Sequence, residues 1–224
     1  KNFAGASPTP ARKWLFRATA ALLPFLALAV LELALRLGGY GYATNFFKPL
    51  QIEDQSFLVE NDSFGFRFFP HEMARTPLTF RMPAKKPVGA YRIFILGESA
   101  AMVDPEPEFG AGRYLADLLR ERFPQVDFEV VNTAMTAINS HAILPIARDC
   151  AGREGDLWIL YVGNNEMVGP FGAATVFGPK VPPLALVRLY LASQELRVGQ
   201  LALELKRKFK GCSEAESWGG MKMF

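Results

Sequence analysis

The chain has 224 residues, half of them hydrophobic, and a formal net charge of +3 at pH 7. This composition is too apolar for a disordered protein and too weakly charged for a dedicated nucleic-acid-binding protein. Its two clusters of basic residues, within residues 12–17 and 206–210, are not interleaved with aromatic side chains along a strand or loop, so we expect no nucleic-acid partner.

An apolar run over residues 18–35 reads ATAALLPFLALAVLELAL, and Glu32 is its one charged residue. As a helix this run is about 27 Å long, close to the thickness of a bilayer core. Tyr40 and Tyr42 follow it, as is typical of a membrane interface. Glu32 and Arg36 are four residues apart, so they share a helix face and can pair. The sequence therefore predicts a transmembrane helix over residues 18–38.

The distribution of basic residues predicts the orientation of this helix. Residues 1–17 are rich in lysine and arginine, whereas only Arg36 and Lys48 follow the run closely. Positive loops stay inside, so we expect a cytoplasmic N-terminus and a periplasmic C-terminal domain, in a single-pass protein of the bacterial inner membrane. A cleaved signal peptide is less favoured, because residues 37–40 are a poor cleavage site. A buried helix of a soluble core is rarely so apolar on every face.

Residues 43–87 mix aromatic, proline and polar residues without a long helical period. The alternation at residues 63–70 and 78–82 predicts two short strands. We therefore expect a β-rich lead-in that ends in a linker at residues 83–87.

The pattern of a parallel α/β domain begins at residue 88. Apolar runs that end in glycine or asparagine predict strands, and runs with apolar residues at helical spacing predict the helices between them. Alternation of strand and helix implies right-handed crossovers and a parallel sheet. The expected strands are 91–96, 127–131 and 157–162, and the expected helices are 113–123 and 140–150, the second capped by Asn139 or Ser140.

The last third of the chain has a different character. Residues 169–183 are rich in proline and glycine and are expected to be a loop. Residues 184–210 predict one long amphipathic helix with a basic C-terminal end. We favour packing of this helix against the sheet over binding to a membrane surface, because its basic residues cluster at one end.

Three loops should meet where the predicted strands end, because the carboxyl ends of parallel strands share one edge of the sheet. The first contains Gly97, Glu98 and Ser99, the second spans residues 132–137, and the third spans residues 163–166. Glycines in such loops are also what tight turns need, and Asn164 and Asn165 can cap helices. Turn geometry alone does not predict serine and asparagine on separate loops.

These loops resemble the SGNH/GDSL hydrolase family over residues 88–180. Gly97-Glu98-Ser99 is similar to its Gly-Asp-Ser block, and Gly163-Asn164-Asn165-Glu166 to its Gly-x-Asn-Asp block. The resemblance implies a flavodoxin-like three-layer domain with a parallel sheet, present in part over residues 88–224. It makes Ser99 the nucleophile, with the Asn165 side chain and the backbone N–H of Ala134 in the oxyanion hole. Glutamate replaces the family's aspartate at both 98 and 166, and Ala134 replaces a glycine.

The family's catalytic base is a histidine in an Asp-x-x-His segment, which this sequence does not contain. His71 and His141 are the two histidines, and neither follows an aspartate by three positions. We expect a structural or exposed role for His71, and for His141 a helix-capping or surface role. The hydrolase hypothesis therefore requires that the natural chain continue beyond Phe224.

Two functional hypotheses follow from these features. The first is a membrane-anchored hydrolase of esters or acyl groups, with cell-envelope carbohydrate esters or lipids as substrates. The second is a non-catalytic accessory subunit, held by the span to other subunits of a larger membrane complex, such as a respiratory or photosynthetic one. No cofactor or metal is expected, because Cys150 and Cys212 match neither zinc nor redox spacing. Two separate thiols are favoured over a disulfide.

Overall fold

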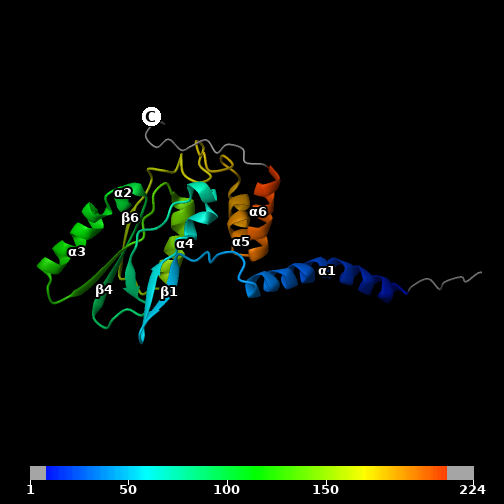
Figure 1. Ribbon diagram of the computed structural model, residues 1–224, viewed down its shortest axis with the longest axis horizontal. Helices are drawn as coiled ribbons and strands as arrows, with labels where there is room; N and C mark the ends of the chain where they lie inside the picture. Colours follow the sequence, from blue (N-terminus) through cyan, green and yellow to red (C-terminus); the bar gives the residue numbers. More distant parts are fainter. Residues whose placement is uncertain (1–8, 211–224) are drawn as a thin grey trace, which may run out of the picture. The chain divides into compact units, whose positions relative to one another are not determined.

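The computed structural model describes residues 9–210, which fall into two compact units (Figure 1). Among the described residues, one unit consists of residues 9–42 and 192–210. The other contains residues 43–191, with one antiparallel and one parallel sheet of three strands each. The protein is therefore a mixed α/β protein with a parallel sheet, as the sequence predicts.

The N-terminal helix α1 spans Pro10–Leu37, so it begins before the apolar run and contains it. Proline suits the first helical position, where its missing N–H has no intrahelical partner to lose. The alanines and leucines that follow are strong helix formers. No residue of α1 is buried, and α1 is the one helix within residues 9–210 that is long and apolar enough to cross a membrane.

The C-terminal end of α1 lies at paired glycines. The N–H of Gly38 donates to the carbonyl of Ala34, and that of Tyr40 donates to the carbonyl of Leu35, both at 2.9 Å. Gly39 has φ +70°, a left-handed conformation that a side chain would disfavour. The predicted pair within the helix is confirmed, because Arg36 Nε lies 2.7 Å from Glu32 Oε1.

The expected single helix over residues 184–210 is wrong, because the structure has two helices. Helix α5 spans Leu184–Gln194 and helix α6 spans Arg197–Lys210. The turn between them is tight enough that a Cβ on Gly199 would lie 1.8 Å from the carbonyl oxygen of Ser193. The residues between the two helices, Glu195 and Leu196, are neither glycine nor proline, so the local sequence does not reveal the break.

The antiparallel sheet has the strand order β1-β2-β3, formed by β1 (Phe47–Ile52), β2 (Gln55–Glu60) and β3 (Arg81–Pro83). It confirms a β-rich lead-in, although only β3 overlaps a predicted strand. The strand expected at residues 63–70 is wrong, since Phe64–Arg67 forms a 3₁₀ turn and His71–Met73 another. The phenylalanines of this segment alternate in sequence as in a strand, but the backbone that carries their side chains into the core is coiled.

The parallel sheet has the strand order β5-β4-β6, and all three of its strands agree with the predictions. The central strand β4 is Ala90–Gly97, flanked by β5 (Asp127–Asn132) and β6 (Leu157–Tyr161). A four-residue helix α2 (Ser99–Met102) follows β4, and a 3₁₀ turn follows at Pro107–Phe109. The predicted helices are α3 (Ala111–Arg122) and α4 (Ser140–Ala151).

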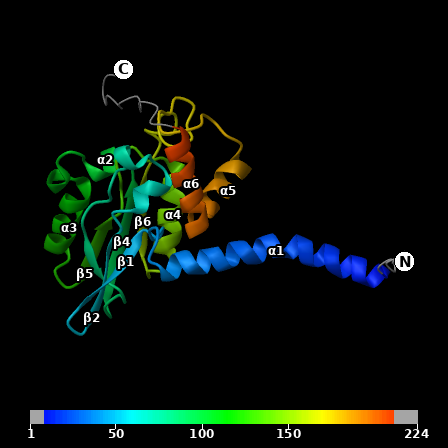
Figure 2. The ribbon, with the colours of Figure 1, turned by 45° about the vertical axis from the view of Figure 1, so that its right-hand side comes forward.

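Helices cover both faces of the parallel sheet, because the chain moves from β4 to one neighbour and then crosses to the other (Figure 2). Phe94 and Leu96 belong to the main core with Ile146 of α4, and this core also includes the aromatic residues of the lead-in. Ile95 points the other way and packs against Ala101 of α2. The lead-in and the parallel sheet therefore share one hydrophobic core.

A fully buried arginine links the two sheets through hydrogen bonds. Arg92 of β4 donates from Nε to Glu129 of β5 at 2.8 Å, and its other nitrogens donate to the carbonyls of Pro83 and Arg153. A buried guanidinium is tolerated only when its donors are satisfied, so these bonds hold β3 against the parallel sheet.

Candidate active site

The three predicted loops meet at the carboxyl edge of the parallel sheet, where hydrogen bonds join them in pairs. Loop 1 is residues 97–99. Loop 2, predicted at 132–137, extends over residues 132–139 in the structure, and loop 3, predicted at 163–166, extends over residues 162–170. The N–H of Met135 in loop 2 donates to the carbonyl of Gly97 at 3.3 Å. The Asn165 Nδ2 of loop 3 donates to the carbonyl of Ile138 in loop 2 at 3.1 Å. Residues far apart in the sequence therefore form one cluster.

Loop 1 and loop 3 are joined by the carboxylate of Glu98, which is completely buried. Its Oε1 accepts the N–H of Gly163 at 3.0 Å, and its Oε2 accepts the N–H of Asn165 at 2.8 Å. Burying a carboxylate is costly unless it is hydrogen-bonded, and bonds to a charged acceptor are stronger than neutral ones. We call this arrangement the Glu98 clasp.

Ser99 is the first residue of α2 and is half-buried. No described residue hydrogen-bonds its hydroxyl, which leaves Oγ able to meet a base or a substrate. The tight turn depends on Gly97, where a Cβ would lie 2.4 Å from the Cβ of Ala101 and 2.6 Å from the carbonyl oxygen of Tyr161. Ser99 is thus presented at the end of β4 by a backbone that excludes larger residues at position 97.

The Asn165 side chain is placed by both neighbouring loops. Its backbone N–H belongs to the Glu98 clasp, and one of its two amide protons is used by the carbonyl of Ile138. Among the described residues no partner takes its other amide proton, so that proton can stabilise a developing negative charge.

Ala134 lies in loop 2 and is completely buried. Its backbone N–H donates to Asn132 Oδ1 at 3.1 Å, and Asn132 Nδ2 donates to the carbonyl of Ala101 at 2.9 Å. The oxyanion-hole role that the resemblance implies for this N–H stays a prediction. In that role the N–H of Ala134 would have to exchange its hydrogen bond to Asn132 Oδ1 for one to the substrate oxygen when a substrate binds.

Comparison of the chain with protein-family models, with curated proteins and with solved structures gives no match. The case for any function therefore depends on the residues and contacts of the site.

Glu166 has a structural place in loop 3. Its two carboxylate oxygens accept the backbone N–H and the hydroxyl of Ser140, each at 2.8 Å. Asn139 is the N-cap of α4, as one of the two predicted alternatives, and it accepts the N–H of His141 at 3.3 Å. These bonds attach loop 3 to the start of α4. They restrain Asn165 from the side of loop 3 opposite to the Glu98 clasp.

A further contact, which the sequence does not predict, joins loop 2 to the segment after α2. The Thr136 hydroxyl donates to Asp104 Oδ2 at 2.6 Å, and Thr136 is buried. The two residues are 32 positions apart, and nothing in the residue pattern around either one indicates the pairing. This bond restrains the far end of the turn that carries Ser99.

Both histidines pack against aromatic rings. The His71 ring stacks on Phe66 at 4.0 Å between centroids, and the His141 ring meets Phe171 edge-on at 5.5 Å. No hydrogen bond joins either ring to Ser99. The first turn of α4 contains His141, but Asn139 caps this helix. The residues described here therefore place no base on the Ser99 hydroxyl.

Within residues 9–210 no group of three or more histidine, cysteine, aspartate or glutamate side chains is arranged to hold a metal ion. Cys150 is buried, and burial raises the pKa of its thiol to about 12. Its suggested partner, Cys212, lies outside the described residues, so the relation between the two cysteines stays a prediction.

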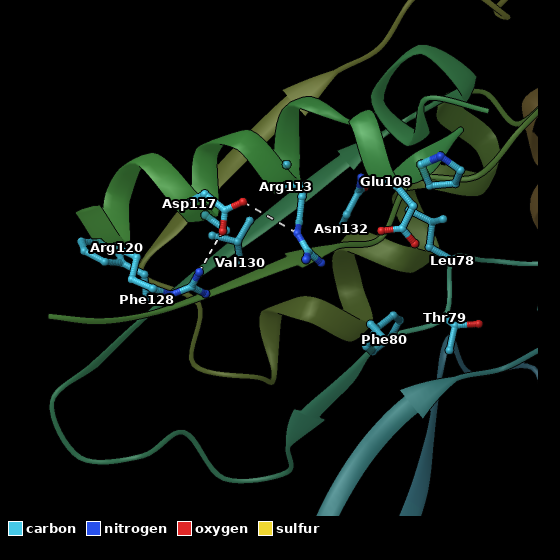
Figure 3. Close-up of a pocket in the computed structure, with 13 residues that line it drawn as sticks. Leu78, Thr79, Phe80, Glu108, Arg113, Asp117, Arg120, Phe128, Val130 and Asn132 are labelled. Atoms are coloured by element: carbon cyan, nitrogen blue, oxygen red, sulfur yellow. Dashed lines mark hydrogen bonds and ion pairs between the residues drawn. The ribbon is translucent and has the colours of Figure 1, made fainter. Parts of the chain in front are cut away.

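A groove of about 640 Å³ lies beside the free edge of β5, away from loops 1 and 3 (Figure 3). One wall is α3, where Asp117 pairs with Arg120 at 2.8 Å and with Arg113 at 3.8 Å. The other wall includes Leu78 and Phe80 from the segment before β3. Asn132 is the one lining residue that also belongs to loop 2, so the groove contacts the candidate site only at its border.

Proposed function

We propose that the protein is a membrane-anchored hydrolase of esters or acyl groups, similar to SGNH/GDSL hydrolases, with Ser99 as its nucleophile. The observation that supports this most strongly is the Glu98 clasp. It holds the nucleophile loop against the loop of the oxyanion donor, although Glu98 and Gly163 are 65 residues apart. A buried glutamate side chain that joins two loops in this way is more than a tight turn needs.

The proposed reaction follows from the groups at this edge. The Ser99 hydroxyl attacks the acyl carbonyl carbon while a base removes its proton, and the carbonyl oxygen becomes an oxyanion that the free amide proton of Asn165 stabilises. The alcohol leaves with the proton returned by the base, and water then cleaves the acyl-enzyme and restores Ser99. The base would be the histidine of an Asp-x-x-His segment, as the resemblance implies.

Helix α1 would provide the anchor. It is long and apolar enough to span a bilayer, and no residue of it is buried. Its basic N-terminal side favours a cytoplasmic N-terminus, which would place the α/β unit in the periplasm of a bacterial cell. Esters of envelope carbohydrates or lipids are then the substrates within reach.

The test is labelling of the full natural protein, in its membranes, with a fluorophosphonate probe that reacts with activated serines. We expect labelling of the natural chain and complete loss in Ser99→Ala. The matched control is Ser56→Ala, which removes an exposed hydroxyl from β2 and should leave labelling unchanged. Absence of labelling in the folded full-length protein would exclude the serine hydrolase.

A second candidate function is the non-catalytic accessory subunit of a membrane complex. The occupied N–H of Ala134 and the aromatic packing of both histidines favour it, because neither provides catalytic machinery. Gentle detergent extraction followed by size analysis tests this alternative. Migration with other subunits would support it, whereas migration as a single chain together with probe labelling would support the hydrolase.

A further inference from the structure

The unit that contains α1 has an unusual polar contact near the end of the apolar helix. Glu32 is the one acidic residue of α1, and its carboxylate accepts the backbone N–H groups of Arg197 at 3.0 Å and Val198 at 2.9 Å. These are the first residues of α6, whose unpaired N–H groups and positive dipole end favour a carboxylate. Arg36 holds the same carboxylate from the side of α1. Glu32 therefore acts as a latch between two helices.

A second set of contacts fixes α6 over its first two turns. Tyr40 donates its hydroxyl to Glu204 Oε2 at 2.5 Å. The backbone N–H and carbonyl of Tyr42 each bond the Gln200 side-chain amide at 3.0 Å. With these bonds α6 crosses the C-terminal end of α1 instead of running beside it (Figures 1 and 2).

The outer surface of α6 is apolar along one face and basic on both sides of it. Residues at spacings of three and four form the apolar face, which the described structure leaves uncovered at its far end, where Phe209 is 87% exposed. This face consists of Val198, Leu201, Ala202, Leu205 and Phe209. Helix α6 has five basic residues and one acidic residue. Lys206 lies on one side of the apolar face, and Lys208, which pairs with Glu204 at 2.8 Å, lies on the other.

We propose that α6 lies on the anionic phospholipid surface of the membrane that α1 spans, with its apolar face in the interface. This inference depends on the proposed anchoring. If α1 crosses the bilayer, a helix fixed across its outer end runs near the membrane plane. Exposed phenylalanine and leucine can then enter the headgroup region while the lysines on either side meet lipid phosphates. The latch at Glu32 holds the helix at that depth.

The uncovered face therefore has a specific occupant. Charge complementarity selects anionic lipid, and the hydrogen-bonded link to α1 places the face beside the bilayer without help from another protein. The basic residues at the end of α6 lie next to Leu205 and Phe209, so charge and apolar surface act on the same part of the membrane.

The test uses the full-length protein in lipid nanodiscs, with an environment-sensitive dye on an introduced cysteine. Phe209→Cys reports on α6, and Leu26→Cys reports on α1. Both are made with Cys212→Ser, while Cys150 stays because it is buried. Lipids with a quenching group near the headgroup probe position 209, lipids with the quenching group deep in the acyl chain probe position 26, and the dye on glutathione defines the aqueous signal. We expect quenching of the dye at position 209 in discs that contain phosphatidylglycerol.

Two variants sharpen this result. Replacing Lys206 and Lys208 together with glutamine should lower the ratio of lipid-bound to free α6, by roughly fivefold for each charge removed. Glu32→Gln should reduce quenching at position 209 and leave it unchanged at position 26. The inference is overturned if the dye at position 209 stays in water, or is shielded without lipid quenching, while position 26 is quenched. Absence of quenching at position 26 would overturn the anchoring itself.

Discussion

Glu98→Ala is the substitution that most directly tests the site. It removes both acceptors of the clasp and leaves the N–H groups of Gly163 and Asn165 without partners. Gly163 is exposed and Asn165 is half-buried, so water can reach these two N–H groups after the substitution. At roughly 0.5–1.5 kcal/mol for each lost bond, we expect a loss of roughly 1–3 kcal/mol in the free energy of unfolding of the α/β unit. In urea the unfolding midpoint should fall by roughly 0.5–1.5 M.

Tryptophan fluorescence provides the assay, because Trp158 of β6 packs at 6.3 Å from the ring of Phe94 in the core. Glu98→Gln keeps the shape but offers only one acceptor oxygen, so it should cost roughly half as much. Glu72→Gln is the control, since Glu72 is exposed and its replacement should change stability by less than about 0.5 kcal/mol. If Glu98→Ala matches this control and keeps full probe labelling at Ser99, the clasp has no role in stability or in placing Asn165.

Three other predictions concern the α/β unit. Gly97→Ala should destabilise the α/β unit by roughly 1–3 kcal/mol in the same urea assay, because its Cβ would collide with Ala101 and the backbone of Tyr161. A cost below that of an ordinary surface substitution would argue against the tight turn. The bond from Lys86 lowers the pKa of Asp156, with help from the backbone N–H of Arg92. The stabilisation by the Asp156 carboxylate should therefore be complete above the pKa that Asp156 has in the unfolded chain. It should disappear as pH falls through the lower pKa that Asp156 has in the folded protein. Unfolding of the natural protein and of Asp156→Asn across pH measures this, and an equal difference at all pH values would contradict it. The raised pKa of Cys150, about 12, predicts that a thiol reagent at pH 8 modifies this cysteine only after unfolding. Mass analysis of the peptide with and without urea decides the point, and rapid modification of the folded protein would show that the thiol is accessible.

Elements with a strong local pattern could be predicted from the sequence. The three parallel strands are apolar runs that end in glycine or asparagine, and the helices after β4 and β5 have clear apolar faces. The apolar run in α1 is long, and its composition alone is enough to indicate a membrane-spanning length. In these cases the signal lies within a window of neighbouring residues, which is the range over which periodicity and propensity operate.

Elements that depend on packing were less predictable. The phenylalanines at residues 64–69 have strand-like spacing, but they enter the core from 3₁₀ turns. The break before α6 arises where Glu32 binds the first N–H groups of that helix, and 165 residues separate Glu32 from Arg197. Periodicity cannot register a partner so distant in the chain.

The sequence by itself was sufficient to nominate Ser99 and Asn165 and to predict that their loops meet at one edge of a parallel sheet. Only the tertiary structure showed that Glu98 joins those loops and that Asn132 occupies the N–H of Ala134. The physical reason is that strand and loop types follow from local side-chain patterns, whereas the partner of a buried polar group depends on which distant backbone atoms the fold brings beside it.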